Sequence, residues 1–391
     1  MLTEHNMNLC INATILTWAR ERNGFSVEEL AEKAHISPNE IEMWEAGIEA
    51  PSYDHLEDIA DYLKTPVAVF FFPEPPNLDD PKKKFRRLPD YEFDRLSPDT
   101  IQTIYLAQAY QDSLAELVSG DLPEKQIFRD LNPKSVSVKK FAQLARAYLG
   151  ITIKQQFSFR SAESAFKAWR HALETAGVFT FKDSLEDRFV SGFCLLHDQF
   201  PVIMVNNSNA FSRQLFTIAH ELGHILFGVH GITDVDETYF DLMDQADREL
   251  EIKCNEFAAE LLVPDDEFKK DIVSFRAAGP ELIPQIAQKY SVSREVILRR
   301  LLEHKLVTSE IYDTLSNQWN KDFLRSRTKK PGGDYYRTRL AYLGEGFTHL
   351  AFERYYEGRL NKVQVATHLN INARNIDKLE RYASGRDETR R

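Results

Sequence analysis

The chain has 391 residues, of which 43% are hydrophobic and 28% are charged, so its composition is that of an ordinary globular protein. Its three cysteines (Cys10, Cys194 and Cys254) are widely spaced and odd in number, which argues against a disulfide framework. No apolar run is long enough to cross a bilayer and no signal-peptide pattern is present, so we expect a cytoplasmic protein of two or three domains without a membrane partner.

The formal net charge of −11 is unevenly distributed along the chain. Residues 1–80 contain four Lys or Arg against sixteen Asp or Glu, a net charge of −12. Residues 321–391 contain sixteen Lys or Arg against nine Asp or Glu, a net charge of +7. We therefore expect the two ends of the chain to bind different kinds of partner.

Residues 1–72 show the pattern of a small helical domain. A helix is predicted at Ala13–Arg22, and Ser26 is placed to cap a second helix. A turn at residues 36–38 precedes a third helix at residues 39–47, which overlaps the motif WEAGIEAP at residues 44–51. A fourth helix is predicted at residues 53–63. This pattern resembles the XRE, or Cro/repressor-type, helix-turn-helix family, and the resemblance implies an all-α domain.

The charge of the expected recognition helix argues against DNA. That helix contains Glu40, Glu42 and Glu45 but no Lys or Arg, and no Lys or Arg occurs between Lys33 and Lys64. Affinity for DNA comes largely from cations that neutralise phosphates. Two interpretations stay open: the domain reads a major groove, or it is a helical bundle for protein contacts or dimerisation, which the charge favours.

Residues 73–96 are predicted to be a linker, proline-rich at first and then basic at residues 82–87. The basic run could touch phosphate, but a solvated tether is the simpler interpretation. Residues 97–158 are predicted to be a helical connecting region, with amphipathic helices at Pro98–Val118 and Val138–Leu149.

Residues 159–306 contain both helical and strand-like patterns. A helix is predicted at residues 162–176, followed by short strands at residues 178–182, 192–197 and 201–206. Together with the helices that follow, these strands predict a small sheet packed on helices. We therefore expect an α+β domain within a multidomain, mainly α chain.

The sequence HELGH carries the clearest chemistry in the chain. On a helix, His220 and His224 lie on one face and can share one metal ion, while Glu221 lies close enough to act on a water molecule. The residues expected to delimit this helix are Ser208 or Asn209 as the cap and Gly228 at the end. The simpler alternative is a buried helix that carries two histidines without a metal.

A second predicted helix at residues 247–264 offers a third metal ligand. Glu251 lies on its apolar side, where a carboxylate is costly unless a cation meets it, so Glu251 is the predicted ligand. Asn255, one turn further on, is placed to accept the outer N–H of a ligating histidine. The opposite, charged row is expected to face solvent and consists of Glu249, Lys253, Glu256 and Glu260.

HELGH followed by EIKCNEFAAELLVP resembles the ImmA/IrrE family of zinc metallopeptidases, which are of the gluzincin type. The resemblance covers about residues 160–305. It implies a zincin-like peptidase domain in which the two histidines and Glu251 hold Zn²⁺ and Glu221 is the general base. It also implies a protein substrate, typically a transcriptional repressor, often in phage, mobile-element or stress settings.

We therefore expect a regulatory zinc-dependent endopeptidase that cleaves a repressor or a toxin–antitoxin type regulator. Two other interpretations stay open. One is a non-catalytic, antitoxin-like binding protein in which zinc only stabilises the fold, and the other is a DNA-binding repressor switched by the protease domain. The presence of Glu221 favours the enzyme over a purely structural zinc site, which needs no base.

Three further side chains could donate a hydrogen bond to the oxyanion of peptide cleavage. They are His197, His230 and Tyr239, and each is more simply a surface or packing residue. At the end of the domain, residues 281–306 predict a further helix–turn–helix with its turn at residues 291–293.

A linker is predicted at residues 307–334, and a basic, helical C-terminal domain at residues 335–391. Residues 334–360 predict one helix that ends near Gly358. Residues 362–383 have the spacing of apolar residues that is typical of a second helix-turn-helix.

The second helix of this C-terminal pair presents the cations Arg374, Lys378 and Arg381, so this end of the chain is the better candidate for binding DNA. The alternative is a helical cap that docks on the acidic N-terminal domain of the same chain or of a second copy, which would make the protein a homodimer.

Overall fold

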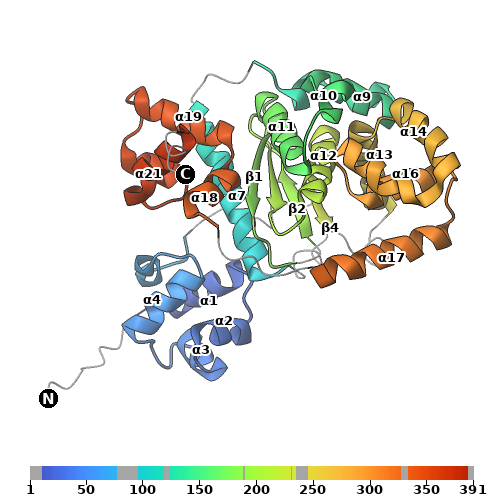
Figure 1. Ribbon diagram of the computed structural model, residues 1–391. Coiled ribbons are helices and arrows are strands. Elements are labelled where there is room, and N and C mark those ends of the chain that lie inside the picture. The colour runs from blue at the N-terminus through green and yellow to red at the C-terminus, as the bar shows by residue number, and fades with distance from the viewer. Residues whose placement is uncertain are drawn as a thin grey trace. The chain divides into compact units, whose positions relative to one another are not determined.

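The arrangement of helices and strands comes from a computed structural model (Figure 1). It divides into two compact units, residues 1–106 and 107–391. The residues that the structure describes are 11–76, 96–118, 124–187, 190–229, 231–234, 245–326 and 333–385.

The first unit is a bundle of short helices. Its elements are α1 (Ala13–Arg22), α2 (Val27–Ala34), α3 (Pro38–Glu45), α4 (Tyr53–Tyr62) and the 3₁₀ turn η1 (Val67–Phe71). α2 and α3 each begin with a capping box, in which a Ser and a Glu three residues apart bond to each other's backbone N–H groups. Leu16, Ile41 and Leu56 are fully buried between the helices. The helix-turn-helix arrangement is therefore the one that the sequence predicts.

The cations of this first unit are largely engaged inside it. The contacts are Arg20 with Glu45 (2.7 Å), Lys33 with Asp99 (3.2 Å) and Arg22 over the ring of Tyr105 (4.2 Å to the centroid). Among the described residues of this unit, Lys64 is the remaining Lys or Arg, and it is exposed. The predicted basic run at residues 82–87 lies outside the described ranges.

The second unit is built on a four-stranded sheet with the order β1-β3-β2-β4. Its strands are β1 (Phe179–Asp183), β2 (Val190–Leu195), β3 (Val202–Asn206) and β4 (Gly231–Asp234). β1 pairs with β3 in parallel, and the other two pairings are antiparallel. The sequence predicts three of these strands but misses β4. That segment has only four residues and no alternating apolar pattern, so its strand conformation comes from pairing with β2.

Helices cover both faces of the sheet (Figure 1). α11 (Ala162–Thr175) and α12 (Phe211–Phe227) pack on one face, where Ile203 and Val205 join their core. The second half of α7 (Pro98–Val118) and α19 (Glu345–Tyr356) cover the other face. There, the rings of Tyr110 and Phe347 pack on Phe181 at centroid distances of 4.5 and 5.1 Å.

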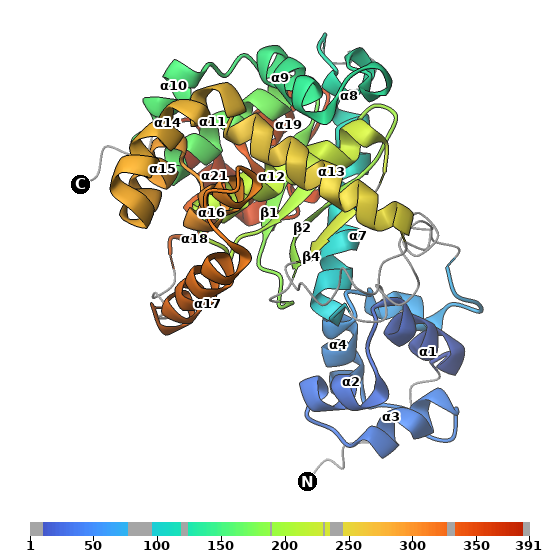
Figure 2. The ribbon, with the colours of Figure 1, turned by 90° about the vertical axis from the view of Figure 1, so that its right-hand side faces the viewer.

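Two more helices pack against α12 on the side away from the sheet. They are α13 (Gln245–Leu262) and α9 (Val138–Leu149), and Figure 2 shows α13 running beside α12. The ring of Phe257 on α13 lies 5.8 Å from Phe141 of α9 and 6.2 Å from Phe227 of α12. α12 is therefore buried between the sheet and a second layer of helices.

The C-terminal segment packs on this unit through a buried ion pair. Arg170 and Glu174 of α11 lie 3.0 Å apart. Arg170 donates to the carbonyl of Ala341 at 2.6 Å, while Glu174 accepts the backbone N–H of Gly346 at 3.1 Å. α18 (Tyr335–Leu343) and α19 are thereby attached to α11 and to the β1 edge of the sheet.

The single helix predicted for residues 334–360 is wrong, because the chain breaks at Gly344 between α18 and α19. Gly344 has φ +88°, and a Cβ there would lie 2.4 Å from Nη2 of Arg170. The break is needed to fit the chain around the ion pair, which no local sequence signal reveals. α20 (Lys362–His368) and α21 (Ile376–Ala383) then form the predicted helix-turn-helix.

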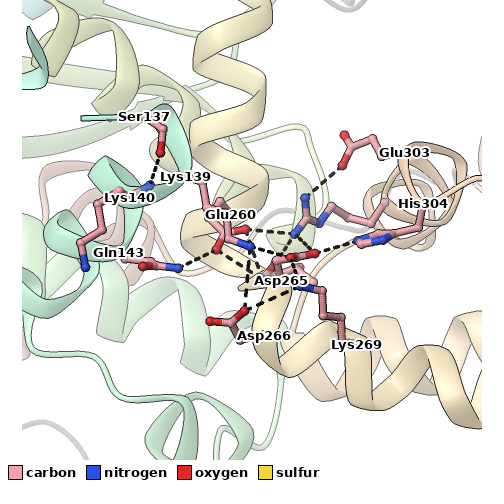
Figure 3. A network of polar contacts seen from close by, with 12 residues as sticks. Ser137, Lys139, Lys140, Gln143, Glu260, Asp265, Asp266, Lys269, Glu303 and His304 are labelled. Carbon is pink, nitrogen blue, oxygen red and sulfur yellow. Dashed lines mark hydrogen bonds and ion pairs between the residues drawn. The ribbon is translucent and has the colours of Figure 1, made fainter. Parts of the chain in front are cut away.

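Glu260 is also placed differently from the prediction. It is 2% exposed rather than solvent-facing, because the last turn of α13 is covered by α9 and by α16 (Arg294–Glu303). Arg300 donates to Glu260 at 3.0 Å and Gln143 donates at 3.3 Å. The neighbouring Asp265 extends this network, which Figure 3 shows from close by, through Lys139 at 2.5 Å and His304 at 2.8 Å.

The other helices in the described ranges of this unit are α8 (Ile127–Asp130), α10 (Ile153–Phe157), α14 (Asp265–Ala278), α15 (Ile283–Tyr290) and α17 (Ser309–Ser326), with the 3₁₀ turns η2 (Pro133–Ser135), η4 (Gly279–Leu282) and η5 (Ala373–Asn375). α15 and α16 form the predicted helix–turn–helix, whereas α17 lies in the predicted linker and buries Tyr312. No helix in the described ranges is long and apolar enough to cross a membrane.

Candidate metal centre

α12 is the element that carries the HELGH sequence, and it ends at Gly228 as predicted. Its predicted cap is wrong. Ser208 uses its backbone N–H and hydroxyl to bond the side chain of Asn206, and Asn209 donates toward the hydroxyl of Ser191. Ala210 occupies the cap position instead, and it has no side chain that can accept a hydrogen bond.

Three potential metal ligands converge between α12 and α13. The Nε2 atoms of His220 and His224 lie 2.9 Å apart, and the two oxygens of Glu251 lie 3.1 and 2.9 Å from them. The ligand atoms all lie within 4.8 Å of one another, and the two histidines are each 1% exposed. We call these three residues the His–His–Glu cluster.

The donor set of the His–His–Glu cluster fits Zn²⁺. Zinc binds imidazole nitrogen and carboxylate oxygen at about 2.0–2.2 Å in a tetrahedron, which places its ligand atoms about 3.3 Å apart. The observed separations of 2.9–3.1 Å are close to that spacing. Two histidines and one glutamate leave one tetrahedral position for water, which is the arrangement of catalytic rather than structural zinc sites.

The pKa values of Glu251 and His224 are shifted by their burial and by their charged neighbours. Burial raises the pKa of the Glu251 carboxyl, but His224 and His220 lower it by more, so its pKa lies well below the usual range. Burial lowers the pKa of His224, but Cys254 and Glu251 raise it by more, and its pKa lies well above the usual range. The buried Glu251 carboxylate between the two imidazoles therefore favours a cation in the cluster.

The sequence and its domains match known families. Residues 173–302 match the family model of the IrrE N-terminal-like domain, and residues 16–70 match a helix-turn-helix family model. The chain thus combines a segment that matches the IrrE N-terminal-like domain with an N-terminal segment that matches a helix-turn-helix domain. It is also similar to the radiation response metalloprotease IrrE of Deinococcus radiodurans, with 32% identity over 104 residues. That match spans 26% of this chain and 31% of the relative's length.

Asn255 lies beside one of the candidate metal ligands, as the sequence predicts. Nδ1 of His220 lies 3.1 Å from Oδ1 of Asn255, so the amide oxygen can accept the outer N–H and leave Nε2 for the metal. Glu221 is fully buried beside His220 on α12. Glu249 is exposed and accepts a hydrogen bond from Gln245 at 3.1 Å, so α13 presents Glu251 to the histidines and not Glu249.

Sequence reasoning missed two glycines that allow α12 to pack so closely. A Cβ on Gly223 would lie 3.3 Å from the ring of Phe257 and 3.4 Å from Cα of Cys254, so α13 approaches the HELGH turn directly. A Cβ on Gly192 would lie 2.6 Å from the methyl group of Thr217, so the glycine allows β2 to pack closely on α12. Glycine inside a helix or strand is the only signal for such an approach.

The three oxyanion candidates stay predictions. His197 lies in the turn after β2, where its Nδ1 accepts the backbone N–H groups of Gln199 and Phe200 at 3.0 and 3.1 Å. This contact gives His197 a structural role in the turn between β2 and β3. His230 and Tyr239 lie outside the described residues.

The three cations predicted to bind DNA lie on the surface at the C-terminal end. Arg374 is in η5, while Lys378 and Arg381 are on α21, and all three are exposed. The Lys378 ammonium lies 4.7 Å from the centroid of the Tyr336 ring, which holds it on one side of the helix pair.

Proposed function

We propose that this protein is a regulatory zinc-dependent endopeptidase that cleaves a protein partner. The observation that carries the proposal is the His–His–Glu cluster, with the buried carboxylate of Glu221 next to His220 on the same helix. A zinc site of this composition with an adjacent carboxylate is the arrangement used to hydrolyse peptide bonds.

His220, His224 and Glu251 would hold the zinc ion, which supplies a Lewis acid for the scissile carbonyl and acidifies water when bound. Glu221 takes the proton from the attacking water and gives it to the leaving amine. Asn255 keeps the ring of His220 in the orientation that directs Nε2 into the cluster. The burial of Glu221 and both histidines excludes bulk water and strengthens these interactions.

The partner is proposed to be a transcriptional repressor or a toxin–antitoxin type regulator. Support comes from the helix-turn-helix domain and from the similarity to IrrE, a radiation response metalloprotease. The alternative, a binding protein with a structural zinc site, does not account for Glu221. A fully buried carboxylate that ligates no metal is costly in a site with a purely structural role.

DNA is proposed as a further partner of the C-terminal helix pair. Arg374, Lys378 and Arg381 are all exposed there, and only Lys378 of the three lies over a ring, that of Tyr336. In the N-terminal unit, Arg20, Arg22 and Lys33 are only partly exposed and each contacts a carboxylate or a ring. A surface needs several available cations to neutralise phosphates. The C-terminal end would therefore bind DNA, whereas the acidic N-terminal end would contact protein.

The test compares wild type with Glu221→Gln and with the exposed control Glu249→Gln in the native host. New protein N-termini are identified by mass spectrometry, and bound zinc is measured in the purified proteins. We expect Glu221→Gln to keep zinc and lose every new N-terminus, because the base is lost and the ligands are not. The control variant Glu249→Gln should produce the same new N-termini as wild type. Identical N-termini from wild type and Glu221→Gln would refute an endopeptidase.

A further inference from the structure

Tyrosine rings gather where α18 and α21 pack against each other near the C-terminal end of the chain (Figure 1). The rings of Tyr336 on α18 and Tyr382 on α21 stack at a centroid distance of 5.3 Å. The ring of Tyr335 meets the Tyr336 ring edge-on at 5.1 Å, and Tyr335 is 48% exposed. A ring that is half in water adds little to a protein core, so it can contact a ligand instead.

Three cations line one side of the second helix of this pair. Arg374 in η5 is followed on α21 by Lys378 and Arg381, at spacings of four and three residues that place them on one helical face, and all three are exposed. The Lys378 ammonium lies 4.7 Å from the centroid of the Tyr336 ring, so the cations adjoin the rings. We call this set the aromatic–basic surface, and it consists of Tyr335, Tyr336, Arg374, Lys378 and Arg381.

Asp334 is an acidic neighbour of the aromatic–basic surface. Its carboxylate accepts a hydrogen bond from the Tyr382 hydroxyl at 2.9 Å and from the backbone N–H groups of Tyr336 and Arg337 at 2.9 and 3.0 Å. Asp334 thereby caps α18, and the helix dipole offsets part of a negative charge at this end of a helix. The three cations therefore leave the aromatic–basic surface with an excess of positive charge.

The side-chain oxygens of α21 and its cap that could read base edges in a DNA groove are engaged within the chain. Oδ1 of Asn375 accepts a hydrogen bond from the Tyr336 hydroxyl at 3.2 Å, and Asp377 pairs with a lysine of α20 at 2.7 Å. Glu380 accepts a hydrogen bond from the hydroxyl of Tyr356. A recognition helix reads a duplex through side chains of these kinds. α21 therefore offers charge to phosphates but little to base edges.

We propose that the aromatic–basic surface binds single-stranded DNA, with a base stacked on the ring of Tyr335 and phosphates beside the three cations. The inference rests on the proposed DNA partner of the C-terminal helix pair and names the form of DNA that it takes. In a duplex, neighbouring base pairs cover the faces of each base, so an exposed ring cannot stack on them. In a single strand every base presents a face, and such binding tolerates many sequences and weakens with salt.

The test measures the fluorescence anisotropy of labelled oligo(dT), and of its duplex with oligo(dA), during titration with the full-length protein. We expect the single strand to bind more tightly than the duplex by roughly fivefold to a hundredfold, the contribution of one stacked base. Tyr335→Leu keeps an apolar side chain but removes the stacking face. It should weaken single-strand binding by a similar factor and leave duplex binding unchanged. Tyr335→Trp keeps an aromatic face and should bind the single strand at least as tightly as wild type does.

Tyr356→Leu is the matched control. Tyr356 is 66% exposed, and its hydroxyl contacts Glu380, which lies two residues from Lys378 and so on the opposite side of α21. This variant should bind both probes like wild type. If neither probe binds to wild type, the proposed DNA partner fails and this inference fails with it. If the duplex binds as tightly as the single strand, or if Tyr335→Leu binds the single strand like wild type, DNA remains a partner but stacking on Tyr335 is excluded.

Discussion

The Nδ1 atom of His220 lies 3.1 Å from Oδ1 of Asn255, so an amide on α13 orients the ring of a candidate ligand on α12. This contact joins the two helices at the cluster itself. Removing the acceptor frees the imidazole to rotate and to change tautomer. Outer partners of this kind commonly contribute a factor of ten to a hundred in metal affinity.

Asn255→Leu should therefore weaken zinc binding by about tenfold to a hundredfold. Asn255→Asp keeps an oxygen acceptor at the same position and should retain affinity near that of wild type. Competition with a chromophoric chelator gives both affinities. Equal affinities for wild type and Asn255→Leu would show that the amide does not position His220.

The choice between two carboxylates on α13 gives a second prediction. Glu251→Gln should lower the zinc content well below one ion per chain, because an amide is a poor zinc ligand. Glu249→Gln should leave zinc content unchanged, because Glu249 is exposed and bonds only Gln245 in the described structure. Elemental analysis of the two purified variants decides the matter, and the reverse pattern would exchange their roles.

The third prediction concerns DNA. Replacing Arg374, Lys378 and Arg381 by Gln in the full-length chain should abolish most DNA affinity. The slope of log affinity against log salt concentration should also become less steep by roughly 2 to 3, because three phosphate contacts are lost. Mobility-shift titrations at several salt concentrations measure both quantities. The exposed Lys64→Gln is the matched control in the N-terminal unit.

Residues 1–80 alone are expected to bind duplex DNA negligibly at physiological salt, because their cations are few and mostly engaged. Tight, sequence-selective binding by this fragment would contradict the proposed division of roles. Deleting residues 335–391 is the less informative experiment. The deletion also removes α19, whose Phe347 packs on the ring of Phe181 on the sheet.

The fourth prediction concerns pH. Burial raises the pKa of Asp265, but Lys139 and Lys269 lower it by more, so its pKa lies well below the usual range. A carboxyl whose pKa is depressed on folding contributes stability above its unfolded pKa of about 3.9 and loses it as pH falls towards the folded pKa. Asp265→Asn should therefore lower the free energy of unfolding at pH 7. Its difference from wild type should shrink below about pH 4.

Urea unfolding at a series of pH values measures this difference. Asp266→Asn is the matched control, because Asp266 is the adjacent residue and its side chain is 76% exposed. The control should have nearly the same free energy of unfolding as wild type throughout. If the difference in free energy of unfolding between Asp265→Asn and wild type stayed constant over the whole pH range, ion pairing of Asp265 would not be its cause.

Local signals explain what the sequence predicts well. The Ser–Glu capping boxes at Ser26 and Ser37 fix the starts of two helices, and the fourfold spacing of His220 and His224 places both imidazoles on one face. The apolar row on α13 correctly predicts which side of that helix meets the histidines. These features depend on residues within one or two helical turns.

Features that depend on distant partners escape the sequence. Glu260 fits a charged helical row, yet it is buried because Arg300, forty residues away, covers it. The helix break at Gly344 depends on Arg170, and β4 exists only as a partner of β2. The cap of α12 is mispredicted because Asn206 engages the hydroxyl of Ser208. In each case a tertiary contact overrides local preference.

The C-terminal cover of the sheet has a consequence for biosynthesis. Phe181 on β1 packs against Phe347 of α19, and Arg170 on α11 donates a hydrogen bond to the carbonyl of Ala341 on α18. In each contact, the two partners are separated by more than 150 residues of chain. During translation the strands emerge long before the helices that shield one of their faces. A chain that stops before residue 335 therefore exposes an aromatic surface to chaperones and degradative proteases. Completion of translation thus becomes a condition for assembling the whole sheet domain.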